Sequence, residues 1–194
     1  MCMRICLSAL LLPVLVACGA GRMPDEMTVR RINVVDEKGV VRLVIAGEAP
    51  ATIARGHEYP RAITPAAIIW YDEDGNESGG LAAAPLADGR KMRMITFDFT
   101  HQLTDAVRMG TFESPDGAHW NAAFEAFDRL PYTPGEIQTS QGKRRIVLGT
   151  EDADAGLVIL DPEERERIRM RVDADGVAVF EILDVQGQVV FRAP

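Results

Sequence analysis

The sequence predicts an all-β domain, and three observations lead to this prediction. Apolar and polar residues alternate with a period of two from position 29 almost to the C-terminus, which is typical of strands with one side against a core. The motif Asp-x-x-Gly recurs between these stretches, and an Asp that starts a turn with a Gly that ends it favours a tight hairpin. No crossover helix separates the stretches, so the sheet should be antiparallel. Four copies of the motif stand at 36–39, 72–75, 173–176 and 184–187, at unequal intervals.

We expect about 10–12 strands in an antiparallel meander that closes as a barrel or folds as a sandwich. The segment 167–172 alternates most clearly, because Ile168, Met170 and Val172 alternate with three arginines. Such a strand should be half buried, with its arginines in solvent and paired across strands with residues such as Glu181. The alternative is a basic stripe for an anionic partner. The expected strands are 31–36, 40–45, 66–71, 78–84, 92–99, 105–112, 121–128, 144–149, 156–160, 167–173, 177–183 and 188–192.

Several segments are less regular. Segments 46–65 and 129–144 are rich in Pro, Gly or Ala, and they are expected to form long loops. Segment 118–130 could be a helix or a strand, and its neighbours favour the strand. Segment 161–166 could form one helical turn or a plain turn. The pair Gly79-Gly80 suggests a bulge or a close approach of two backbones.

The N-terminus has the pattern of a secretory signal. One Arg precedes an apolar run that is too short to span a bilayer as a permanent helix. The run ends in Leu15-Val16-Ala17-Cys18, which resembles a bacterial lipobox at all four positions. The resemblance implies cleavage before Cys18, a diacylglyceryl group on its thiol and a further acyl chain, such as palmitate, on the new amino group. The chain then divides into a signal peptide (1–17, with the signal helix), a lipidated tether (18–28) and a single β domain (29–194).

The lipobox resemblance also implies a location. Gly19 follows the cysteine in place of the aspartate linked to inner-membrane retention, so we expect an outer-membrane lipoprotein that faces the periplasm. The membrane is then a partner through the Cys18 lipid, and an envelope protein is a further possible partner. A net charge of −8 argues against nucleic acid as a partner.

Cysteine usage limits the chemistry. The three cysteines are Cys2, Cys6 and Cys18, so the expected mature domain has no disulfide, no cysteine nucleophile and no thiolate metal site.

No catalytic constellation and no cofactor motif is found. The residues considered for a metal are Asp72, Asp74 and Glu77, since oxygen ligands at close spacing can hold Ca²⁺. A solvated acidic hairpin turn is the favoured interpretation. His57, His101 and His119 lack the spacing of metal ligands, and no serine stands in a hydrolase motif. Four aromatic residues could line a ligand groove, but a core role is favoured for them: Trp70, Tyr71, Trp120 and Tyr132.

The strings that begin at Arg31 and at Trp70, with the closing turns after Val172 and Leu183, resemble a group of secreted bacterial β proteins with no known activity. That resemblance implies the fold and no chemistry. We therefore expect a non-catalytic binding or structural module of the bacterial envelope. The alternatives are a small-ligand or lipid carrier that uses a barrel interior, and an envelope hydrolase that uses carboxylates drawn from several loops.

Overall fold

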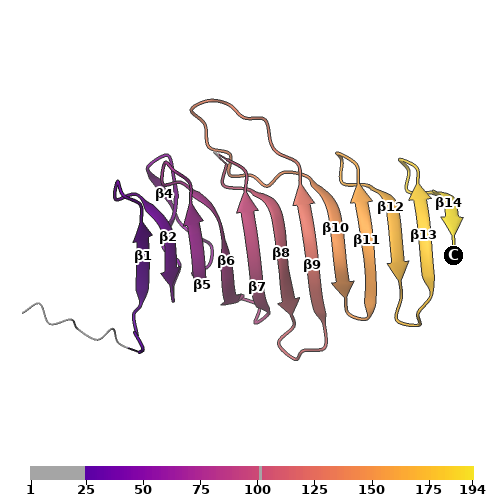
Figure 1. The fold of residues 1–194 in the computed structure, drawn as a ribbon. Helices are drawn as coiled ribbons and strands as arrows, with labels where there is room; N and C mark the ends of the chain where they lie inside the picture. The colour runs from indigo at the N-terminus through magenta and orange to yellow at the C-terminus, as the bar shows by residue number, and fades with distance from the viewer. Residues whose placement is uncertain (1–24, 101) are drawn as a thin grey trace, which may run out of the picture.

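The computed structural model describes residues 25–100 and 102–194, and this part of the chain is all-β. Twelve of its fourteen strands form one antiparallel sheet, in which each strand pairs with the one before and the one after it (Figure 1). This confirms the antiparallel meander. The predicted signal peptide (1–17) and Cys18 lie outside the described residues. The strands of the sheet are β1 (Arg31–Val35), β2 (Val41–Ala46), β5 (Ala66–Tyr71), β6 (Glu77–Pro85), β7 (Lys91–Asp98), β8 (Asp105–Glu113), β9 (Trp120–Phe127), β10 (Arg144–Glu151), β11 (Asp154–Leu160), β12 (Glu166–Val172), β13 (Ala178–Leu183) and β14 (Val189–Ala193).

The sheet is a single open layer, where the sequence suggested a barrel or a sandwich. β1 and β14 form its two edges, and they lie at opposite ends of the sheet (Figure 1). The connections explain this result. A sandwich needs connections that pass from one sheet to the other. Here both long connections, between β2 and β5 and between β9 and β10, return the chain to the adjacent strand of the same sheet.

The turns form as the Asp-x-x-Gly motif predicts. In the first of them, Asp36 Oδ1 accepts hydrogen bonds from the backbone N–H groups of Lys38 and Val40, and Gly39 adopts a φ of 82°. The same carboxylate bonds recur at Asp72, Asp173 and Asp184. They also recur at Asp161, so segment 161–166 is a turn and not a helix.

The expectation of a loop at 46–65 is corrected, because this segment contains a short hairpin. β3 (Thr52–Ala54) and β4 (His57–Tyr59) pair with each other through a turn in which Arg55 and Gly56 both have positive φ. Such a turn suits a two-residue hairpin. We call the segment 47–65 the flap. Its strands have three residues each, too few to show a period of two in the sequence.

The flap covers the buried core of the domain. Val44, which has no exposed surface, packs with Ile69 and Tyr71 of β5 beneath the flap residues Ala49 and Ile53. The ambiguous segment 118–130 contains strand β9, as favoured, and most of segment 129–144 is irregular, as expected.

Candidate functional site

The register of the sheet aligns one apolar residue from each of its twelve strands in a continuous row. Paired residues lie on the same side of a sheet, so the row crosses the whole width of the molecule. No member of this row is polar or charged. In spatial order the members are Ile32, Ile45, Ile68, Leu81, Ile95, Met109, Phe124, Leu148, Leu157, Met170, Phe180 and Ala193.

A second apolar row runs parallel to the first, two residues along each strand. At β6 its position is taken by Gly79, and Trp70 contacts Phe97 across the gap with ring centroids 5.4 Å apart. We call the side of the sheet that carries both rows the apolar face. The other members of the second row are Val34, Leu43, Val107, Ala126, Ile146, Ile159, Ile168, Ile182 and Phe191.

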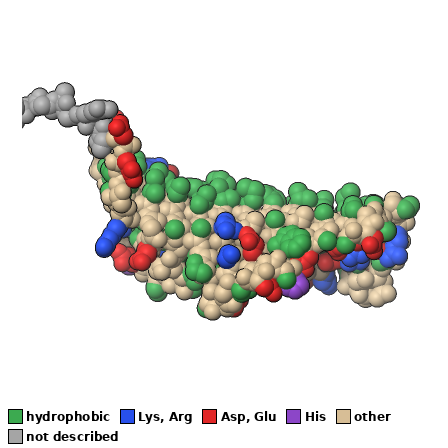
Figure 2. Space-filling model, turned by 90° about the horizontal axis from the view of Figure 1, so that it is seen from below, with side chains coloured by type: hydrophobic (Ala, Val, Ile, Leu, Met, Phe, Trp, Pro, Cys, Tyr) green, Lys and Arg blue, Asp and Glu red, His purple; other side chains and the backbone are tan. Residues whose placement is uncertain are grey.

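Within residues 25–100 and 102–194, no segment covers the apolar face. Gly79 is the one buried residue of the two rows, and Leu148, Phe97 and Met109 are 53%, 52% and 50% exposed. Figure 2 shows apolar side chains gathered along one side of the molecule and most of the charged ones toward the other. An apolar surface that extends over twelve strands is far larger than the scattered apolar residues of an ordinary protein surface, and exposed apolar surfaces of this kind are typical of interaction sites.

The sequence prediction that Ile168, Met170 and Val172 would be half buried in a core is therefore wrong for this chain alone. Met170 is 48% exposed and Val172 is 45% exposed. The alternation correctly placed the three residues on one side of the sheet. It could not show whether this chain supplies the layer that covers them.

The opposite face is the one that the chain itself covers. At its N-terminal end it carries the core beneath the flap. Near β7 the opposite face is flanked by the loop before β8 and the loop before β10. Leu103 and Thr139 of these loops line a cavity together with Met94 and Thr96 of β7. The flap and the loop before β10 thus both lie on the side of the sheet away from the apolar face.

Toward the C-terminus the opposite face carries ion pairs. Glu181, only 2% exposed, accepts hydrogen bonds from Arg169 Nε at 2.8 Å and from Arg192 Nε at 2.7 Å. These bonds, Arg169 first, lower the pKa of Glu181. Glu125 is held in the same way by Arg108 and Arg144. The predicted pairing of the arginines of β12 is confirmed, and the stripe is largely neutralised by acidic partners.

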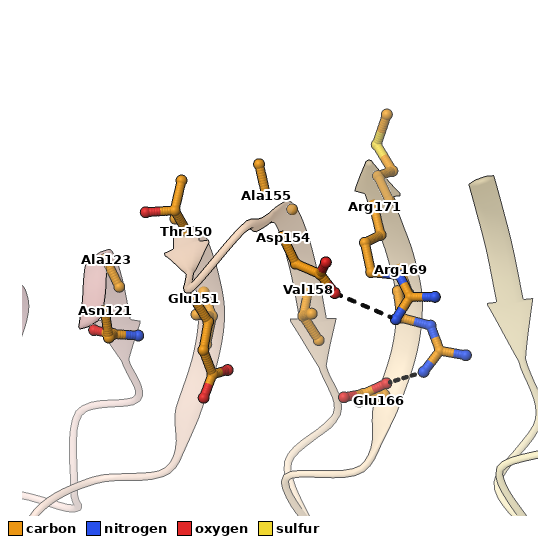
Figure 3. A pocket seen from close by; sticks show the side chains of 14 residues that line it. Asn121, Ala123, Thr150, Glu151, Asp154, Ala155, Val158, Glu166, Arg169 and Arg171 are labelled. Atoms are coloured by element: carbon orange, nitrogen blue, oxygen red, sulfur yellow. Dashed lines mark hydrogen bonds and ion pairs between the residues drawn. The ribbon is translucent and has the colours of Figure 1, made fainter. Parts of the chain in front are cut away.

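A shallow pocket of about 280 Å³ lies among β9 to β12 (Figure 3). Gly149 and Gly156 have no side chain to fill it. Arg171 contacts Asp154 at 3.7 Å and Arg169 contacts Glu166 at 3.0 Å, so the charges at its margin compensate one another. Both arginines of the pocket are thus paired with carboxylates, so neither is left free to bind an anionic ligand.

A second cavity, of about 530 Å³, lies between the flap and β7. Asp98 and Asp105 line it and are paired in the register of β7 and β8. Burial, followed by the nearby Asp105 carboxylate, raises the pKa of Asp98 to about 7. Burial also raises the pKa of Asp105. The sequence interpretation missed this pair, because seven positions separate the two residues and only the hairpin brings them together.

The residues considered for a metal have other roles in the structure. Asp72 Oδ1 caps the turn before β6, and both of its carboxylate oxygens accept hydrogen bonds from the side-chain amide of Asn76. Glu77 forms an ion pair with Arg61 of the flap. Asp74 is exposed at the turn. Within residues 25–100 and 102–194, no group of three or more metal-ligating side chains converges.

Among the described residues, the structure does not bring His57 and His119 together, nor the four aromatic residues. His57 lies in β4 of the flap, His119 pairs with Asp152 at 3.0 Å, and His101 lies outside the described residues. Trp70 and Trp120 lie on the apolar face. Tyr71 is buried beneath the flap, and Tyr132 lies in the loop before β10, where Arg55 donates a hydrogen bond to its hydroxyl.

Comparisons with other proteins add no assignment. Neither the models of known protein families nor the curated proteins give a match to this chain. In the described part of the chain, no helix has the length and hydropathy needed to span a membrane.

Proposed function

We propose that this protein is a non-catalytic binding module of the bacterial envelope, held at a membrane by lipid on Cys18 and engaging its partner through the apolar face. The observation that carries the proposal is the pair of apolar rows, which crosses all twelve strands of the sheet. A sheet normally buries such a face against a second layer, because apolar surface in contact with water costs about 25 cal/mol per Å².

The placement of the remaining segments supports a surface kept open for a partner. The flap and the loop before β10 are the two long connections between strands of the sheet, and both lie on the opposite face. The chain therefore has segments long enough to cover apolar residues, yet it leaves its largest apolar surface open.

The two alternative functions have less support. A carrier needs an enclosed interior, and an open single-layer sheet does not enclose one. A hydrolase would be favoured by Asp98 and Asp105, which line one cavity and have raised pKa values. The apolar face would have no part in such chemistry, so the binding module accounts for more of the structure.

Photo-crosslinking tests the proposal in the full-length, lipidated protein in its own membranes. A photoreactive amino acid is placed at Met109 or Leu148 on the apolar face, or at Val190 as a control. Val190 is 63% exposed. Its neighbour in β14, Phe191, lies on the apolar face, so Val190 points to the opposite face, as Arg192 does. Specific adducts should form from Met109 and Leu148 and not from Val190. Equal labelling at all three positions, or no adducts, would contradict the proposal.

A further inference from the structure

We infer that the partner of the apolar face is a second copy of this chain, so that two single-layer sheets stack face to face as one sandwich. The inference rests on the proposed binding function and identifies the surface that completes it. A sandwich is one of the two architectures that the alternating sequence predicts, the other being a barrel, and a single copy supplies one of the two layers of a sandwich.

The size of the face meets the requirement of a stable dimer. Neighbouring strands lie about 4.8 Å apart, so twelve strands span about 50 Å, and the two rows occupy about 14 Å along the strands. The product is on the order of 700 Å² for each copy, which is close to the roughly 800 Å² that each partner contributes to a standard specific interface.

The charge distribution favours a contact between identical faces. In a two-fold contact each patch meets its own copy, so a charged patch would meet the same charge. The two rows of the apolar face contain no charged residue. The nearest charges on this side are at its margin, where Arg93 and Glu113 form an ion pair with each other. The chain has a net charge of −8 but keeps this face neutral.

The relief of the face allows two copies to interdigitate. A hollow of about 720 Å³ lies over β10 to β13, with Leu148, Met170 and Phe180 around small residues such as Ala155 and Ala178. Rings project elsewhere on the same face, at Trp70 and Phe97. Projections and a hollow on one surface suit the packing of two sheets about 10 Å apart.

A membrane surface is the other occupant to weigh. Peripheral attachment of this kind draws on basic residues around the inserted apolar surface. The margin beyond the two rows carries Lys91 and Arg93, but Glu113 pairs with Lys91 in the register and forms an ion pair with Arg93. Together with the acidic net charge, this favours a protein partner over anionic lipid.

Cysteine crosslinking in membranes tests the inference, again with the full-length lipidated protein. The described residues contain no cysteine, so Met109→Cys places a single thiol near the middle of the apolar face, and Val190→Cys is the matched control. A short bis-maleimide should link Met109→Cys into a dimer that contains two differently tagged copies, at least tenfold more efficiently than Val190→Cys. Adding Leu148→Glu should lower this yield at least tenfold, whereas Val190→Glu should not.

The photo-crosslinking experiment separates failure of this inference from failure of the proposed function. Adducts of twice the chain mass support a second copy. Adducts to a different protein, or to lipid, overturn the second copy while the face remains a binding surface. Absence of any adduct overturns both. Circular dichroism of each variant establishes that the fold is retained, which is expected because Met109, Leu148 and Val190 are half exposed or more.

Discussion

Trp70 of β5 contacts Phe97 of β7 although strand β6 lies between them. The contact forms over Gly79, because a Cβ atom there would lie 2.7 Å from Trp70 Nε1 and 2.3 Å from the carbonyl oxygen of Thr96. The indole N–H also donates a hydrogen bond to the carbonyl of Ser78 at 3.1 Å. One missing side chain thus lets two aromatic rings continue the apolar face.

Gly79→Ala should destabilise the domain by more than about 2 kcal/mol, since the added methyl group overlaps backbone and φ at this position is 131°. Gly47→Ala is the control, because nothing lies within 4 Å of the added atom and φ is not positive there. Urea unfolding of the two variants measures the difference. Equal midpoints would show that the close packing around Gly79 is not required.

Asp98 should make stability depend on pH in the neutral range. Its pKa is raised from 3.8 to about 7 in the folded state, so between these values the folded state holds more protons than the unfolded state. Stability therefore falls as pH rises through this window, by on the order of 2–4 kcal/mol in total.

Asp98→Asn removes this titration. The variant should be more stable than the parent chain at pH 8, and the gain should disappear near pH 4. Asp74→Asn, at an exposed turn position, is the control. Urea unfolding at both pH values checks the prediction, and a difference that does not change with pH would contradict the assigned titration.

Glu181→Gln should lower the unfolding temperature more than Glu163→Gln does. Glu181 holds two arginines at a nearly inaccessible position, whereas the Glu163 side chain is 63% exposed beside Arg165. Removing the charge leaves Arg169 and Arg192 without their shared carboxylate. Because the pKa of Glu181 is lowered by these partners, its contribution is present above the ordinary glutamate pKa and is lost as pH falls through the folded value. The difference in unfolding temperature between the two variants should therefore be largest near pH 7 and should shrink as the pH falls, which thermal melts over a pH series measure.

Cys18→Ser should abolish lipid attachment. In cells fed labelled palmitate, the parent chain should carry the label and fractionate with membranes, and the variant should carry none and remain unprocessed or soluble. Cys6→Ser, in the predicted signal peptide, should leave labelling unchanged. Uptake of label by Cys18→Ser would contradict the lipoprotein proposal.

Local features of the fold could be predicted from the sequence because they depend on neighbouring residues. The turns at Asp36 and Asp184 follow from a carboxylate that bonds two backbone N–H groups and a glycine that adopts positive φ. The strand alternation around Met170 follows from the pleat of a single strand. These determinants lie within a few residues of one another.

The features that could not be predicted depend on residues distant in the sequence. The pairing of Asp98 with Asp105 and the flap over Val44 depend on register and on packing between segments. The open architecture depends on which strand each long connection leads to, and the alternation of apolar and polar residues contains no information on that. The rows of the apolar face could have been found by aligning successive strands from their turns, but their exposure could not.

Apart from the flap between β2 and β5, each strand of the sheet pairs only with its neighbours in the sequence, and this has a consequence for how the domain folds. Since β1 and β14 do not meet, the sheet requires no closure between distant ends, and each hairpin can be added to the previous one. The contact order is low for an all-β protein, so folding should be fast for its class. Its unfolding should resemble that of a linear repeat array, in which the terminal hairpins fray before the centre is lost.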